Sequence, residues 1–303
     1  MILRELSRQT LRSCLANGGV RLRTGPIVTC IRSRCDEVLN GLALLYADYP
    51  VEDEGSFADF HAAIAPPRSV RRWLRPQISF EFDGASPFFP LPADQAFAAL
   101  EWGLNWCVSF HCHQYLIVHA ACLERTGCAL LLPGEPGSGK STLCAGLVSR
   151  GWRLLSDELA LLDFATGEAV PLPRPISLKN AAIDVIRAFA HDAVLSTPVH
   201  DTSKGSVAHM RAPLESVHRA GELARPRWIV LPKYRSDATT SLNPLSRGRA
   251  FMELADHAFN YDLHGRRGFD LLADIVSGCH CHTFEYSALD EAVTVFDTLS
   301  ATA

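Results

Sequence analysis

A glycine-rich segment at residues 134–141 carries the most specific chemical signal in the sequence. It reads Gly-Glu-Pro-Gly-Ser-Gly-Lys-Ser and matches the phosphate-binding pattern GxxxxGK[ST]. Its glycines allow successive backbone N–H groups to point at phosphate oxygens, and the positive end of a following helix adds to the attraction. Lys140 would reach the β- and γ-phosphates, and the Ser141 hydroxyl would ligate Mg²⁺. The residues expected to bind the nucleotide are Gly134, Glu135, Pro136, Gly137, Ser138, Gly139, Lys140, Ser141 and Thr142.

An acidic pair follows one helix after this segment. The apolar run 129–132 predicts a strand before the loop, 142–150 predicts a helix after it, and Asp157-Glu158 ends the next strand candidate. A kinase needs a group that takes the proton of the acceptor hydroxyl and oxygen ligands for its Mg²⁺. Asp157 is the candidate base. Glu158 is a candidate Mg²⁺ ligand together with Ser141, with a solvated acid at the strand end as the alternative.

The stretch His119–Asp163 resembles the catalytic core of HPr kinase/phosphorylase and its relatives. Its matching parts are a strand histidine (His119), the loop 134–141, Arg150-Gly-Trp-Arg-Leu154 and the acidic pair, whose second member is Glu158 where those enzymes have Asp. More closely, the chain resembles the HprK-related kinase A family. The blocks that carry this resemblance are EWGLNW (101–106), LLSDE (154–158), PLPRPISLKN (171–180), KGSVAHM (204–210) and FNY (259–261).

The resemblance implies an α/β (α+β) P-loop kinase core of the HPr kinase and PEP carboxykinase-like type. It also implies ATP and Mg²⁺ as cofactors, a protein or peptide as phosphoacceptor, and the possibility of reverse, phosphorolytic transfer. In this family the first acid of the pair is the base, which is Asp157 here. His119 would hold that carboxylate or tune its charge, although a lone histidine on an apolar strand is by itself more often a core residue.

Further cations lie in two downstream segments. Arg174 and Lys179 stand in a Pro-broken segment, and Lys204 stands in a Thr-Ser-Lys-Gly-Ser segment that reads as a mobile loop. Such cations can clamp the oxygens of a transferring phosphoryl group. The alternative is ordinary solvated charge. His209, five residues beyond Lys204, is a weaker candidate.

Two other patterns suggest sites that we do not expect. The runs 279–282 (Cys-His-Cys-His) and 111–113 (His-Cys-His) have the composition of metal ligands. Adjacent residues on a strand point to opposite faces, so neither run can chelate with all its members. The arginine-rich run 68–75, with Trp73, is more typical of a solvated face than of a nucleic-acid or peptide site. The ten scattered cysteines are expected to be free thiols.

The elements that must position these residues divide into two parts. Residues 1–92 predict a small β-rich or α+β module with a hairpin at 18–35, a helix at 36–47 and strands at 57–64 and 77–82. Residues 84–93 are the expected linker, because three prolines occur there. Residues 93–303 predict the ATP-binding catalytic domain. Its expected strands are 115–123, 128–133, 153–155, 159–162, 228–231 and 283–286, and its expected helices are 96–108, 142–150, 181–190, 249–259, 269–276 and 289–299.

Composition limits the function further. The chain of 303 residues is 48% hydrophobic, and 29 Lys and Arg against 33 Asp and Glu give a net charge of −4. No basic stripe predicts nucleic-acid binding, and no apolar run predicts a membrane span. The N-terminus lacks the apolar core of a secretory signal, so we expect a cytoplasmic protein, with homo-oligomers possible.

Three functions fit the sequence. The first is an ATP-dependent kinase that phosphorylates a hydroxyl, preferably a Ser or Thr of a small protein or peptide. The second is a kinase of a small-molecule hydroxyl. The third is an ATP-binding switch or maturation factor without catalysis, in which nucleotide orders the 196–210 segment.

Overall fold

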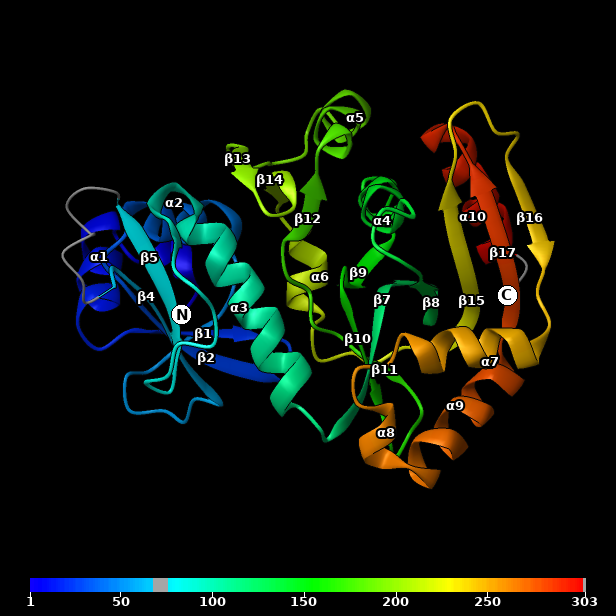
Figure 1. Cartoon of the computed structure of the whole chain (residues 1–303), viewed down its shortest axis with the longest axis horizontal. Helices are drawn as coiled ribbons and strands as arrows, with labels where there is room; N and C mark the ends of the chain where they lie inside the picture. The colour runs from blue at the N-terminus through cyan, green and yellow to red at the C-terminus, as the bar shows by residue number, and fades with distance from the viewer. Residues whose placement is uncertain (68–75, 302–303) are drawn as a thin grey trace.

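The computed structural model describes residues 1–67 and 76–301, which form a mixed α/β fold with three sheets (Figure 1). The arginine-rich run 68–75 lies outside the described residues. The first sheet has the strand order β3-β1-β2-β4-β5-β6 and belongs to the N-terminal part. Its strands are β1 (Val20–Thr24), β2 (Ile27–Ser33), β3 (Val51–Glu52), β4 (Phe60–Ala65), β5 (Gln77–Phe82) and β6 (Leu91–Pro92).

The hairpin expected at 18–35 is confirmed. Strands β1 and β2 pair antiparallel with Thr24 opposite Ile27, so Gly25 and Pro26 form the turn. Gly25 has a φ of 56°, which glycine adopts without a steric cost. A short helix that the sequence did not predict, α1 (Arg8–Ala16), precedes this hairpin, and α2 (Asp36–Leu45) follows it close to the expected position.

Helix α3 (Ala96–His111) packs on the N-terminal sheet, although the sequence placed it in the second domain. It contacts β4, β5 and α2, and Figure 1 shows it lying along that sheet. Gly103 allows this close packing, because a Cβ there would lie 2.1 Å from the Phe80 ring of β5. Because α3 packs with the first sheet, we use the name N-terminal unit for this sheet together with α1, α2 and α3.

The second sheet is the larger one, and its order is β11-β10-β7-β8-β15-β17-β16, with β9 also paired to β7. Strand β15 is parallel to β8 and β17, and the other pairs are antiparallel. The strands are β7 (Tyr115–Arg125), β8 (Cys128–Pro133), β9 (Arg153–Ser156), β10 (Leu159–Asp163), β11 (Ala169–Val170), β15 (Arg225–Tyr234), β16 (Ser241–Pro244) and β17 (His280–Tyr286).

This sheet buries both faces, which explains its nearly continuous apolar strands. Alternate residues of β7 enter two cores: Ile117, Ala121 and Leu123 face the core that includes α4 and α10, whereas Val118 and Cys122 face the core that includes α7 and α9. The helices of this part are α4 (Lys140–Val148), α5 (Ala181–Phe189), α6 (Leu214–His218), α7 (Arg247–Asp256), α8 (Tyr261–His264), α9 (Arg266–Gly278) and α10 (Leu289–Ala301).

A third, three-stranded sheet replaces the loop that the sequence predicted around residues 196–210. It consists of β12 (Ile176–Lys179), β14 (Gly205–Met210) and β13 (Val199–Thr202), in the order β12-β14-β13. Thr202 pairs with Gly205, so Ser203 and Lys204 occupy a tight hairpin turn. The expectation of a loop was wrong because β14 is held as a strand by its pairing with β12, which is distant in sequence and was not recognised as its partner.

The two parts share contacts and one continuous core. The Tyr49 hydroxyl donates to the Pro173 carbonyl at 2.8 Å, and the buried Asp48 carboxylate pairs with both Arg4 and Arg211. No helix within the described residues is long and apolar enough to cross a membrane. All ten cysteines are free thiols, as expected.

Candidate functional site

The glycine-rich segment forms a loop between β8 and α4. Gly134, Gly137 and Gly139 have φ values of 153°, 88° and 93°, which side-chain-bearing residues rarely adopt. The loop is fastened to the strand ends beside it: the Tyr234 N–H donates to the Ser138 carbonyl at 2.9 Å, and the Tyr286 hydroxyl donates to the Gly139 carbonyl at 2.9 Å. A Cβ at Gly139 would lie 2.5 Å from the Tyr286 hydroxyl oxygen, so the loop backbone fits only glycine there.

Lys140 is the first residue of α4, and its side chain folds over the loop. Its ammonium donates to the Gly134 carbonyl and, at 3.5 Å, to the Glu135 carbonyl. The residue is only 7% exposed, and burial lowers the pKa of its ammonium. Carbonyl oxygens thus take the place that phosphate oxygens would take beside this cation.

The acidic pair lies next to the loop. Asp157 is 6% exposed, and its Oδ2 accepts from the Ser141 hydroxyl at 3.2 Å and from the Ser177 N–H at 3.0 Å. Its Oδ1 is buried without a hydrogen-bond partner among the described residues. Burial and the neighbouring Glu158 carboxylate raise the pKa of Asp157 to about 7.

Glu158 has a different environment. One carboxylate oxygen accepts from the Asn105 amide of α3, and the other lies 3.6 Å from the Lys179 ammonium. Burial acts to raise the pKa of Glu158, but the charges of Lys179 and Lys204 outweigh it, so the pKa is lowered. The two neighbouring carboxyl groups therefore differ: Glu158 is ionised at neutral pH, whereas Asp157 loses its proton only near pH 7.

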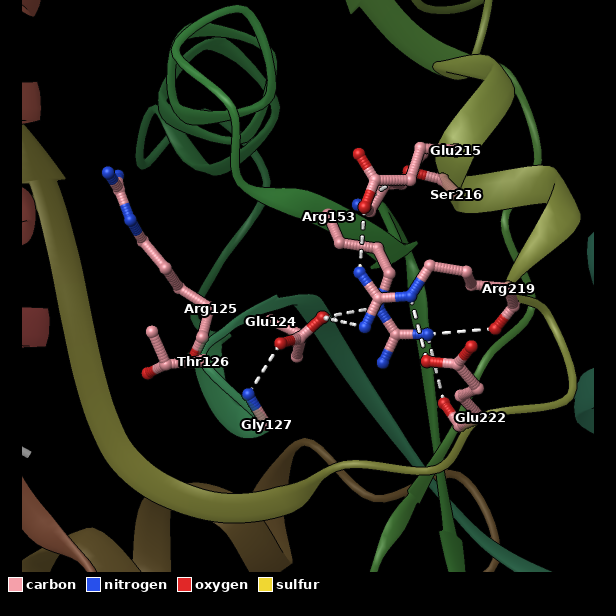
Figure 2. A network of polar contacts seen from close by, with 10 residues as sticks. Glu124, Arg125, Thr126, Gly127, Arg153, Glu215, Ser216, Arg219 and Glu222 are labelled. Atoms are coloured by element: carbon pink, nitrogen blue, oxygen red, sulfur yellow. Dashed lines mark hydrogen bonds and ion pairs between the residues drawn. The ribbon is translucent and has the colours of Figure 1, made fainter.

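A buried polar network fixes the strand that carries the pair (Figure 2). The Arg153 guanidinium at the start of β9 pairs with Glu124 of β7, and both side chains are at most 4% exposed. The same guanidinium donates to the carbonyls of Arg219 at 2.8 Å and Glu222 at 3.0 Å, just after α6. This network ties β9 to β7 and to α6, which sets the position of Asp157 four residues later.

His119 lies on β7 opposite Leu159, directly beside the acidic pair. Burial, followed by the Lys140 charge, lowers the pKa of its imidazole to about 4, so the ring is neutral at pH 7. The described residues give no hydrogen bond from this ring to Asp157, the partner expected from sequence. Glu158 is the carboxylate whose charge acts on this ring, and it acts to raise the pKa of the imidazole against the larger effects of burial and Lys140.

The three further cations separate into two environments. Lys179 and Lys204 line the same cavity as the loop, and the Lys204 ammonium lies 5.0 Å from the centre of the Trp102 ring of α3. Arg174 lies elsewhere: it is 7% exposed and buried in an ion pair with Glu101, and it also donates to the side-chain amide oxygen of Asn105. His209 is buried against the Phe97 ring. Arg174 therefore supports the acidic pair through Asn105 and does not face loop 134–141.

A cavity of about 1210 Å³ joins these groups. One wall carries the loop, the acidic pair and the lysines, and the other comes from the N-terminal unit. The side chains of the N-terminal wall are mostly apolar and aromatic: Ile78, Phe80, Phe88, Phe89, Leu91, Trp102 and Trp106. A charged wall that faces an apolar wall is typical of a site for a ligand with both characters.

The donor set beside the loop fits Mg²⁺ held jointly with phosphates. Ser141 and the unpartnered Asp157 Oδ1 are hard oxygen ligands, and Mg²⁺ is usually bound through one or two carboxylates plus substrate phosphates. Within the described ranges no cluster of three or more His, Cys, Asp or Glu could hold a metal by itself, and this includes the runs 111–113 and 279–282. Ser141 contacts Asp157 and not Glu158, the acid that the sequence paired with it as a Mg²⁺ ligand.

Sequence reasoning assigned no role to Asn105, Trp102, Tyr234 or Tyr286. Asn105 joins Glu158 to Arg174, and it lies one helical turn from Glu101, so the spacing in EWGLNW could have indicated a shared face. Tyr234 and Tyr286 are the last residues of the neighbouring strands β15 and β17, in the sheet that carries the loop. Their position at the end of a strand was the sequence signal that could have placed them near the loop.

Comparison with known proteins adds no relative: no family model matches the chain, and no curated protein matches its sequence.

Proposed function

We propose that the protein is an ATP-dependent kinase that transfers the γ-phosphate of Mg-ATP to a hydroxyl group. The observation that carries the proposal is the Ser141–Asp157 hydrogen bond beside a glycine-rich loop, with Asp157 Oδ1 buried and unpartnered. A loop of this sequence between a strand and a helix is suited to bind phosphates, and the pair beside it offers oxygen ligands for Mg²⁺. The resemblance to the HprK-related kinase A family points to the same P-loop kinase core and favours ATP.

The geometry favours an exchange of the roles that the sequence gave to the two acids. Asp157 and Ser141 would hold Mg²⁺, whose charge would offset that of the phosphates and keep Asp157 ionised. Glu158 is ionised already, and its side chain is 20% exposed toward the cavity, so its position makes it the candidate to take the acceptor proton. Lys140, Lys179 and Lys204 would bind the oxygens of the transferring group.

The acceptor would lie against the N-terminal wall. Phe80, Phe88 and Trp106 form an aromatic cluster there. The centroid of the Phe88 ring lies 5.7 Å from that of Phe80 and 5.9 Å from that of Trp106. Such a wall suits apolar side chains around a Ser or Thr of a peptide or small protein. The small-molecule acceptor and the non-catalytic nucleotide switch are the competing outcomes of the test.

The test is incubation of the protein with γ-labelled Mg-ATP and a panel of peptides and small hydroxyl compounds, followed by mass-spectrometric mapping of the product. We expect Glu158→Gln to lower transfer by about 100-fold or more with ATP affinity retained, in the range of removing a general base. We expect Asp157→Asn to weaken Mg²⁺-dependent ATP binding as well. Loss of transfer in Asp157→Asn with unchanged Mg-ATP affinity would restore Asp157 as the base, and ATP binding without any product would favour the switch.

A further inference from the structure

We propose that Tyr234, the last residue of β15, is the surface on which the base of the bound nucleotide stacks. The inference rests on the proposed function, because it takes loop 134–141 as the site of the phosphates. It adds the direction in which the nucleotide lies in the cavity and a residue that recognises its nucleoside end.

The sheet order sets that direction. Strand β8, which leads into the loop, lies between β7 and β15. Strand β9 pairs with β7 and brings Asp157 to one side of the loop, whereas β15 and β17 end on the other side. Mg²⁺ in such sites bridges the β- and γ-phosphates, so the Ser141–Asp157 pair marks the γ-phosphate end. The nucleoside must then extend toward the ends of β15 and β17.

The charges along the cavity agree with this direction. Among the described residues of its lining, the lysines and carboxylates come from the loop, the acidic pair and the third sheet. The part of the lining beyond the loop, formed by Tyr234, Tyr286, Ser287 and Leu289, carries no charged side chain. A triphosphate is attracted to the first region, and an uncharged aromatic base fits the second.

Tyr234 has the geometry of a stacking surface. Its backbone is fixed beside the loop through the hydrogen bond to Ser138, yet the residue is 51% exposed and lines the cavity. Its ring meets the Tyr286 ring in an edge-to-face contact with centroids 5.8 Å apart. Tyr286 is 1% exposed and holds Gly139, so it supports Tyr234 and the loop and offers no free face. Stacking on Tyr234 would accept any nucleobase, because every base has a π-face.

Calorimetric titration of the full chain with Mg-ATP and, separately, with Mg-tripolyphosphate tests the inference. We expect Tyr234→Ala to weaken ATP binding by about 5- to 100-fold, the range found when a stacking aromatic is removed, and to leave tripolyphosphate binding unchanged. Tyr234→Phe should bind ATP as the unmodified chain does, because the ring is retained.

Phe89→Ala is the matched control, since Phe89 is an exposed aromatic residue at the opposite wall of the same cavity. It should leave ATP affinity unchanged, and loss of ATP affinity in this variant would reverse the proposed direction. Equal ATP affinity of Tyr234→Ala and the unmodified chain would overturn the stacking role while the kinase proposal stands. Failure of the unmodified chain to bind either ATP or tripolyphosphate would overturn both the stacking role and the kinase proposal. Lys140→Ala should weaken the binding of both ligands, which verifies that they bind at the loop.

Discussion

The buried Asp157 makes the stability of the protein depend on pH in a direction opposite to that of most acidic residues. Its carboxyl group loses its proton near pH 3.8 in the unfolded chain but holds it to about pH 7 in the folded one. Between these values the folded state binds more protons, so the free energy of unfolding falls as pH rises. Above pH 7 the protein carries the full cost of a buried carboxylate without a metal ion.

Asp157→Asn removes this cost, because the amide is neutral and similar in shape. Each pH unit is worth about 1.4 kcal/mol, so the two units between pH 5 and pH 7 amount to about 3 kcal/mol. Relative to the unmodified protein, the variant should therefore gain about 3 kcal/mol of stability when pH is raised from 5 to 8. A residue that lowers stability at working pH is typical of a functional site.

Urea unfolding at both pH values, followed by tryptophan fluorescence, measures this double difference. Divalent cations and nucleotide are omitted, because bound Mg²⁺ would favour the ionised carboxylate. Glu158→Gln is the control without a slope: the pKa of Glu158 is lowered from its usual 4.5, so its contribution to stability is lost only as pH falls below about 4.5, and this variant should show almost no such difference between pH 5 and pH 8. A difference between Asp157→Asn and the unmodified protein that stays constant from pH 5 to pH 8 would refute the reasoning.

Two further predictions concern groups around the pair. Arg174→Leu leaves Glu101 buried without its ion-pair partner and should lower the free energy of unfolding by about 3–5 kcal/mol, whereas Arg174→Leu combined with Glu101→Leu should regain most of this loss. Denaturation of the two variants and the unmodified protein checks this, and an equal loss in the double variant contradicts it. The imidazole of His119 should stay neutral from pH 8 to about pH 5, since its pKa is lowered to about 4 by burial and the Lys140 charge. NMR titration of the ring measures this pKa, and a midpoint above pH 6 would contradict the prediction.

The parts of the structure that sequence predicted are those with local signals. The hairpin at 18–35 depends on one turn, and the strand–loop–helix around residues 128–148 depends on one contiguous pattern of glycines and apolar residues. Asp157 and Ser141 could be placed near each other because the chain returns after a single helix. In these cases each residue and its partner fall within about one supersecondary unit.

What sequence did not predict depends on partners far away in the chain. The sequence predicted that Arg174 clamps phosphoryl oxygens or is a solvated cation, and only the fold reveals that Glu101 neutralises it. The pairing of β12 with β14 and the contact of Asn105 with Glu158 likewise join distant segments. The difference in pKa between Asp157 and Glu158 arises from burial and from neighbouring charges, neither of which a sequence pattern encodes.

The packing of α3 limits how the protein can be divided by engineering. This helix is covered by β5 on the N-terminal side, and it supplies Asn105 to Glu158 and Glu101 to Arg174 on the other. A chimaera joined at residue 92 would replace the first sheet by that of another protein. The new sheet would not match the packing surface of α3, and a shift of α3 would disturb the Glu158 carboxylate that Asn105 contacts. The proposed acceptor site is better tested by substitutions of Phe88 and Leu91, which line the same wall of the cavity, than by transplanting the unit.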